Sequence, residues 1–204
     1  MKNDWSNLKK YAIQNEALLD SENSKRIVFI GDSITEFWKN YDIELFKTNF
    51  VNRGISGQTT KEILHRFTQD VLNLKPKIVV ILAGVNDIAE NFGAISNQNI
   101  FENIVSMIDM AKSSKIEVIL CSILPANKFS WKPKITPAEK IIELNKMLKL
   151  YSEVNRITYV DYYNTMIDNE KGLNKKYSDD GVHPNNEGYK IMKPLVIEVI
   201  SKLL

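Results

Sequence analysis

The feature that most constrains the fold is a series of short apolar runs, each nearly continuous and rich in valine and isoleucine. The clear runs are RIVFI (26–30), KIVVIL (77–82), IEVILCSI (116–123) and ITYVD (157–161), and NFVNRG (49–54) is a weaker fifth candidate. A continuous apolar run, unlike an alternating one, is typical of a parallel strand that is covered on both faces. The runs therefore predict a parallel sheet buried between two layers.

Amphipathic helical patterns separate these runs, over residues 59–74, 96–114, 136–155 and 185–204. The first opens with the capping-box pair Thr59 and Glu62. The third is expected to begin with Thr136 as N-cap and Pro137 in the first helical position. In the last, Pro194 is expected to kink the helix or to split it in two.

The alternation of strands and helices predicts an open α/β sandwich. The chain has 204 residues, of which 44% are hydrophobic, and no Gly/Ser/Pro-rich linker divides it. We therefore expect a single domain over residues 1–204, with residues 1–20 forming a peripheral N-terminal helix.

Charge and composition exclude several classes of protein. The net charge is +2 with acids and bases interspersed, so nucleic acid is not an expected partner. No apolar stretch approaches the roughly 18 residues of a membrane span, so no stable membrane insertion is expected.

The start lacks the features of a signal peptide, which predicts a cytoplasmic chain as written, or a secreted or periplasmic one if a leader was trimmed. Cys121 is the one cysteine, so no internal disulfide can form.

Polar residues follow several of the predicted strands. These segments are Gly31-Asp32-Ser33, Arg53-Gly54-Ile55-Ser56-Gly57, Ala83-Gly84-Val85-Asn86-Asp87 and, before the last helix, Asp179-Asp180-Gly181-Val182-His183-Pro184. Sites in open α/β sheets lie beyond the carboxyl ends of the strands. If the sheet is parallel, the four segments therefore converge on one edge.

This set of residues supplies the groups that acyl transfer needs. Ser33 is either a helix cap or a nucleophile, and a serine nucleophile needs a histidine base oriented by a third group. His65 lies opposite the apolar face of its helix, where we expect it to be solvated, so His183 is the candidate base. Asp180, three residues before His183, and Asp179, four before it, compete to orient the imidazole.

A tetrahedral intermediate also needs hydrogen-bond donors for its negatively charged oxygen. The backbone N–H groups of Ser33 and Gly54 and the side-chain amide of Asn86 are the candidate donors. Two histidines far apart in the sequence and one cysteine make no metal-ligand cluster, so no metal site is expected.

Together these segments resemble the four blocks of the SGNH hydrolases, also called the GDSL esterase/lipase family. The matching blocks, in order, are GDSIT (31–35), NRGISG (52–57), GVND (84–87) and DGVHP (180–184). The first reads GDSI where the family name has GDSL. The resemblance favours Asp180 over Asp179. It implies a flavodoxin-like three-layer sandwich with five parallel strands in the order 2-1-3-4-5 and helices on both faces.

The resemblance also implies a mechanism. It predicts an esterase that needs no cofactor or metal, with a Ser33–His183–Asp180 triad and an oxyanion hole formed by Ser33, Gly54 and Asn86. The expected substrate is a small-molecule or carbohydrate ester, with a short acyl group such as acetyl on a sugar or small alcohol. A lysophospholipase or thioesterase acting on longer acyl chains is the enzymatic alternative. A catalytically inactive, ligand-binding relative is the non-enzymatic one.

Other residues near these blocks allow two interpretations. Asp32 is expected to be mainly structural, although it could border the substrate pocket, and Ser56 either shapes the pocket wall or serves the turn. Phe129 and Trp131 follow the fourth strand in a Pro-bounded loop. They either line the pocket, cover the core or meet a second subunit, so a homo-oligomer is left open.

Overall fold

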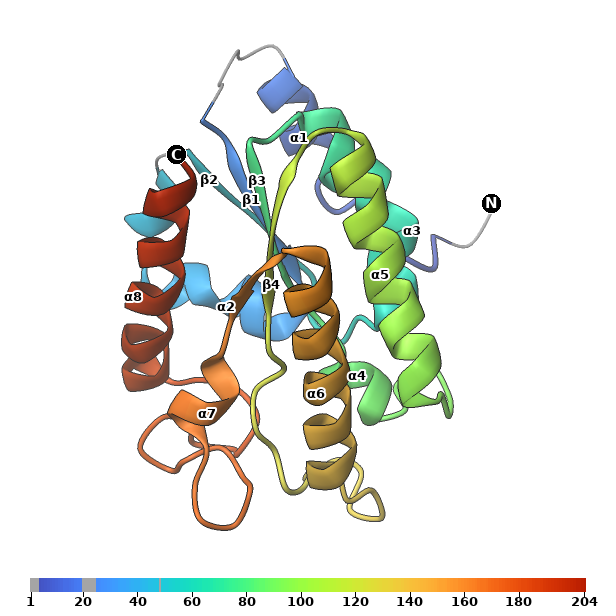
Figure 1. The fold of residues 1–204 in the computed structure, drawn as a ribbon, viewed down its shortest axis with the longest axis vertical. Helices are drawn as coiled ribbons and strands as arrows, with labels where there is room; N and C mark the ends of the chain where they lie inside the picture. The colour runs from blue at the N-terminus through green and yellow to red at the C-terminus, as the bar shows by residue number, and fades with distance from the viewer. Residues whose placement is uncertain (1–3, 20–24, 48) are drawn as a thin grey trace.

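Five parallel strands form the centre of the molecule in a computed structural model that describes residues 4–19, 25–47 and 49–204 (Figure 1). The strands are β1 (Ile27–Gly31), β2 (Phe50–Gly54), β3 (Ile78–Leu82), β4 (Glu117–Cys121) and β5 (Thr158–Val160). Their order is β2-β1-β3-β4-β5, and every pairing is parallel. The predicted fold class and strand order are therefore confirmed.

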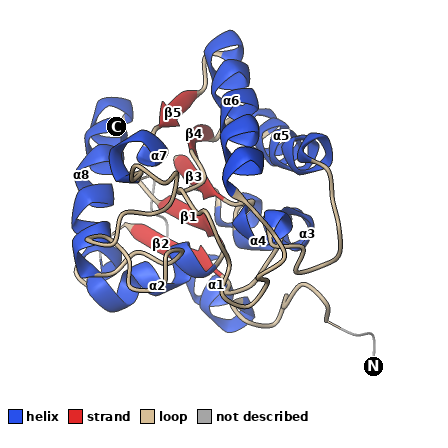
Figure 2. Cartoon of the chain, turned by 90° about the horizontal axis from the view of Figure 1, so that it is seen from below, coloured by secondary structure: helices blue, strands red, loops and turns tan. Residues whose placement is uncertain are grey.

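Helices cover both faces of the sheet. They are α1 (Ala12–Leu19), α2 (Ser33–Tyr41), α3 (Thr60–Asp70), α4 (Val85–Ile88), α5 (Asn97–Ser113), α6 (Ala138–Asn155), α7 (Tyr162–Met166) and α8 (Asn186–Leu203). Figure 2 shows α2, α7 and α8 on one side of the strands and α3, α5 and α6 on the other. No helix in the described ranges is long and apolar enough to span a bilayer.

Burial explains why the strand runs are continuous and not alternating. Every residue of β1 and of β3 is buried, because side chains on both faces meet a helical layer. The helices contribute one apolar stripe each, and on α5 the buried residues are Ile100, Ile104, Met107, Ile108 and Ala111. The core is thus two apolar layers, one on each side of the sheet.

Two helices differ from their predicted form. The helix α6 begins at Ala138 with Pro137 as its N-cap, one residue later than expected. The helix α8 runs as one element through Pro194, so of the two predicted outcomes, a kink or a split, the split is wrong. Pro194 and Lys190, whose carbonyl loses its hydrogen-bond donor, are both solvent-exposed, and water can replace the missing bond.

The N-terminal helix is also shorter than the predicted range of residues 1–20. Residues 12–19 form α1, which packs against α3 and the turn Leu72–Leu74. Residues 4–11 form turns, and the helix prediction for residues 1–3 and 20 lies outside the described residues.

Candidate active site

Ser33, two residues after the end of β1, does not cap α2, because Asp32 takes that position. Asp32 is the N-cap of α2, and its carboxylate accepts the Ile34 N–H at 3.0 Å. Ser33 is the first residue of that helix, where a backbone N–H has no acceptor within the helix. The hydroxyl of Ser33 lies 2.9 Å from Nε2 of His183, although the two residues are 150 positions apart.

The loop before α8 holds the histidine in one orientation. Nδ1 of His183 lies 2.6 Å from Oδ2 of Asp180. The other oxygen of Asp180 accepts the N–H groups of Val182 and His183, each at 2.8 Å. Asp179 instead accepts the side-chain amide of Asn185. An ionised Asp180 requires the proton on Nδ1, which leaves Nε2 to accept from Ser33.

The charge on Asp180 is stabilised within this loop. Its partial burial alone would raise the carboxyl pKa, but the hydrogen bonds from His183 and Val182 outweigh that effect and lower the pKa below its usual value. The Phe37 ring lies 5.5 Å from the imidazole of His183, centroid to centroid, and covers one side of it.

The amide of Asn86 is fixed beside the β2–α3 loop. Nδ2 donates to the Gln58 carbonyl at 3.0 Å, and Oδ1 accepts from Asn91 Nδ2 at 2.9 Å. These two bonds set the orientation of the amide, and the second N–H of Nδ2 is left for another acceptor.

Gly54 does not have the free N–H that an oxyanion donor requires. Its N–H donates to Oδ1 of Asn52 at 2.9 Å. A Cβ at this position would lie 2.1 Å from the backbone nitrogen of Glu36, so the glycine allows α2 to pack closely against β2. The interpretation of Gly54 as an oxyanion donor is therefore corrected.

Gly57, three residues later, has the properties that Gly54 lacks. It has a φ of +79°, and a Cβ there would meet no atom within 4 Å. Its N–H has no protein acceptor among the residues that the structure describes, and its carbonyl accepts from Asn91 at 3.3 Å. Gly57 was not predicted from the sequence as a candidate donor, although its place in the loop beyond the strand was a usable signal.

Two buried carboxylates border the site. Burial raises the pKa of Asp32 to about 7 and that of Asp87 to about 6. Asp87 accepts both the N–H and the hydroxyl of Thr60, which fixes the start of α3. Asp32 caps α2, so the hydrogen bonds that both carboxylates accept are structural.

The remaining pocket candidates occupy different environments. The Ser56 N–H donates to Glu36 at 2.7 Å, which ties its loop to α2. Phe129 is 1% exposed and belongs to the core, so it does not line an open pocket. Trp131 is 43% exposed and stacks on Phe129, with the ring centroids 5.1 Å apart. His65 is exposed as expected, but it also contacts the Ser6 hydroxyl at 2.8 Å.

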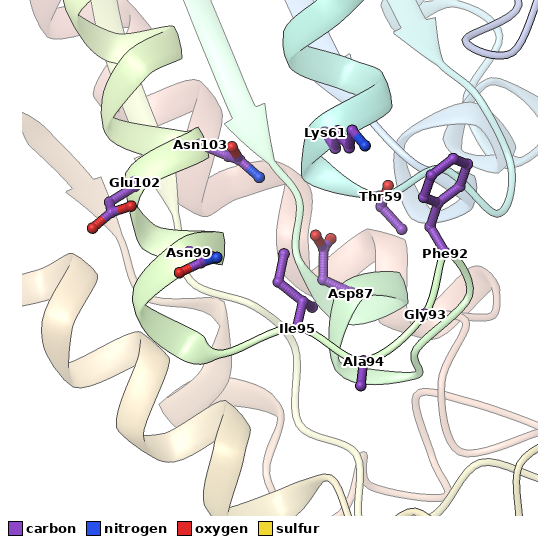
Figure 3. A pocket seen from close by; sticks show the side chains of 10 residues that line it. All are labelled: Thr59, Lys61, Asp87, Phe92, Gly93, Ala94, Ile95, Asn99, Glu102 and Asn103. Atoms are coloured by element: carbon purple, nitrogen blue, oxygen red, sulfur yellow. The ribbon is translucent and has the colours of Figure 1, made fainter.

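Two hollows border this edge of the sheet. One of about 810 Å³ is lined by Asp179, Asp180 and Gly181 and by Lys128 and Lys175. The other, of about 390 Å³, lies between the start of α3 and the first turns of α5 (Figure 3). In Figure 3 its lining side chains include Lys61, Asp87, Phe92, Asn99, Glu102 and Asn103. Both linings mix charged and polar groups with a few apolar ones.

Comparisons with known proteins identify the family of the chain. The model of the GDSL-like lipase/acylhydrolase family matches residues 29–191. A solved structure of a Bacteroides fragilis protein assigned to the acylhydrolases is 48% identical, aligns over 100% of both chains and has a TM-score of 0.96. A GDSL-like lipase from Bacteroides thetaiotaomicron is 47% identical over 98% of this chain and 99% of its own, with a TM-score of 0.94.

The match to curated relatives covers a smaller share of those proteins than the match to the two solved structures does. An acetylxylan esterase from Xylanibacter ruminicola is 28% identical over 153 residues, which cover 65% of this chain and 30% of that protein. The chain spans less than half the length of the curated relatives that it matches.

Proposed function

The chain belongs to the GDSL-like lipase/acylhydrolase family, and from this premise we propose that it is a serine esterase that removes a short acyl group from a sugar or another small hydroxyl compound. The observation that carries the proposal is the continuous series of contacts from the Ser33 hydroxyl through His183 to Asp180, at 2.9 and 2.6 Å. A serine in contact with a histidine that a carboxylate orients is the arrangement for nucleophilic acyl transfer.

In the proposed reaction, Ser33 attacks the ester carbonyl while Nε2 of His183 accepts the hydroxyl proton. The negative oxygen of the tetrahedral intermediate accepts from the N–H groups of Ser33 and Gly57 and from Nδ2 of Asn86. His183 then donates its proton to the leaving alcohol, which frees the product and leaves an acylated Ser33. Water activated by His183 hydrolyses that acyl-enzyme and restores the hydroxyl.

Two observations support a sugar ester as the substrate. About two thirds of this chain is similar, at 28% identity, to 30% of an acetylxylan esterase. The hollow that borders Asp180 contains lysine and aspartate side chains, which suit a hydroxyl-rich compound better than a long hydrocarbon chain, because unpaired polar groups beside such a chain lose their hydration. A lysophospholipase or thioesterase would need a more apolar groove.

The test compares acetyl, butyryl and decanoyl p-nitrophenyl esters, together with an acetylated xylo-oligosaccharide. We expect the acetyl ester to have the highest kcat/KM and acetate to be released from the oligosaccharide. Ser33→Ala and His183→Ala should each lower kcat by at least about 10³-fold. His183→Ala should lower kcat far more than His65→Ala. Ser201→Ala, at an exposed serine near the end of α8, is the control and should keep kcat within a few-fold of wild type. A preference for decanoyl would reject the short-acyl proposal, and full activity of Ser33→Ala would reject the mechanism.

A further inference from the structure

Residues 4–19, named here the N-terminal segment, lie before the first residue of the family match at 29, yet they contact the loop that carries Gly57. The Tyr11 hydroxyl donates to the Gly54 carbonyl at 2.5 Å, and Gln58 Nε2 donates to the Ser6 carbonyl at 2.8 Å. These two contacts hold the loop from both of its ends, since Gly54 precedes it and Gln58 ends it.

The groups that make these contacts are shielded from water. Tyr11 is 4% exposed, Gln58 is 2% exposed and Ser6 is fully buried. Burial raises the pKa of Tyr11 to about 12, so its hydroxyl stays a donor through the neutral range. Hydrogen bonds in such a place are costly to lose, because the partner left behind cannot turn to water.

Gln58 connects the N-terminal segment to the proposed oxyanion donors. Its backbone carbonyl accepts from Asn86 Nδ2 at 3.0 Å, and its side-chain oxygen accepts from Arg66 Nε at 2.6 Å. Arg66 in turn donates to the Gly31 carbonyl at 2.9 Å, two residues before Ser33. A shift of Gln58 would therefore move Gly57 and Asn86 relative to Ser33.

A second set of contacts anchors the segment itself. Asn15 donates to Asp70 at 2.7 Å and accepts from Arg53 Nε at 2.8 Å. Gln69 Nε2 donates to the Leu8 carbonyl at 2.5 Å. The N-terminal segment is thus fixed to α3 and β2 independently of Gln58, and it offers a rigid support to the loop.

We propose that the N-terminal segment is a positioning element for the oxyanion hole, acting through Tyr11 and Gln58 on Gly57 and Asn86. This inference rests on the proposed function. Tyr11 and Gln58 are positioning residues, because they act through the loop and not on the substrate. Since donors for a developing charge must be held within a fraction of an ångström, a looser loop lowers catalysis more than it lowers binding.

The sharpest test is Gln58→Glu. A glutamate keeps the oxygen that accepts from Arg66, but it loses the N–H that Ser6 accepts and sets two oxygens against each other. Asn155→Asp is the control, because it likewise sets a carboxylate against a backbone carbonyl, that of Tyr151, but in α6 and outside the N-terminal segment. Tyr11→Phe removes the hydroxyl at the other end of the loop.

We expect Gln58→Glu and Tyr11→Phe each to lower kcat for p-nitrophenyl acetate about tenfold, with KM within about twofold. Inhibition by phenylboronic acid, which forms a tetrahedral anion on a serine, should weaken by the same factor. Asn155→Asp should leave both quantities near wild type. Melting temperatures are measured for all variants, and Ile104→Val in α5 shows whether lost stability alone changes kcat.

Unchanged kcat and boronate inhibition in Gln58→Glu and Tyr11→Phe, beside an inactive Ser33→Ala, would overturn this inference and leave the proposed function standing. A fall in kcat that Asn155→Asp or Ile104→Val matches would also overturn it, because a general loss of stability would then explain the effect. A wild-type chain that hydrolyses no ester would overturn the proposed function and this inference together.

Discussion

At the scale of single residues, neighbouring residues of the site have different roles. Asp32 caps α2 and accepts the Ile34 N–H, so Ser33 keeps its hydroxyl for His183. Gly54 and Gly57, at the start and near the end of the β2–α3 loop, also have different roles. The first allows two backbones to approach, and the second takes the positive φ that turns the loop.

The two glycines should therefore respond differently to alanine. In Gly54→Ala the new Cβ would lie 2.1 Å from a backbone atom, so we expect a chain that fails to fold or to remain soluble. In Gly57→Ala the Cβ has open space, and the positive φ costs about 1–2 kcal/mol. This variant should stay folded by circular dichroism while kcat falls roughly 10- to 100-fold as its N–H moves. A folded Gly57→Ala with wild-type kcat would remove Gly57 from the oxyanion hole.

At the scale of helices and strands, the elements that follow from the local pattern of apolar residues were predictable from the sequence. The β1 and β3 runs are continuous because both faces are buried, and the α5 stripe follows from helical periodicity. Three of the four site blocks were predictable because the carboxyl ends of parallel strands meet at one sheet edge. The fourth follows no strand, and it was predictable because His183 was the histidine left as a candidate base. Contacts such as Tyr11 with Gly54 were not, because they join residues 43 apart that no local pattern links. The N–H of Gly54 is engaged by Asn52, which sequence cannot reveal.

The helix α8 offers a prediction at this scale. Its Pro194 is exposed and interior to the helix, where proline removes one hydrogen bond and crowds the carbonyl four residues earlier. Pro194→Ala restores the donor to Lys190, so the free energy of unfolding should rise by about 1–3 kcal/mol. Urea unfolding measures this change. Pro194 is an exposed residue of α8 and does not belong to the candidate site, so kcat should not change. A variant with a lower free energy of unfolding would contradict this account.

At the scale of the whole molecule, stability depends on pH through carboxylates of opposite kinds. Asp32 and Asp87 are buried with raised pKa values, whereas Asp180 has a lowered one. A raised carboxyl pKa means that the folded state holds the proton more tightly than the unfolded state. Between about pH 4 and pH 7 the folded chain thus binds more protons at Asp32, and its contribution to stability falls as the pH rises. The contribution of Asp180 has the opposite sign and is lost in acid.

Asp32→Asn isolates this effect, because the asparagine oxygen can still accept the Ile34 N–H. Urea unfolding of both chains at several pH values between 4 and 8 gives the difference in free energy, in which the contributions of carboxylates that do not interact with Asp32 cancel. We expect the variant to gain stability relative to wild type as the pH rises from about 4 to about 7, and the difference to level off above that. A difference that stays constant with pH would mean that folding does not raise the pKa of Asp32. The raised pKa that the burial of this carboxyl predicts would then be wrong.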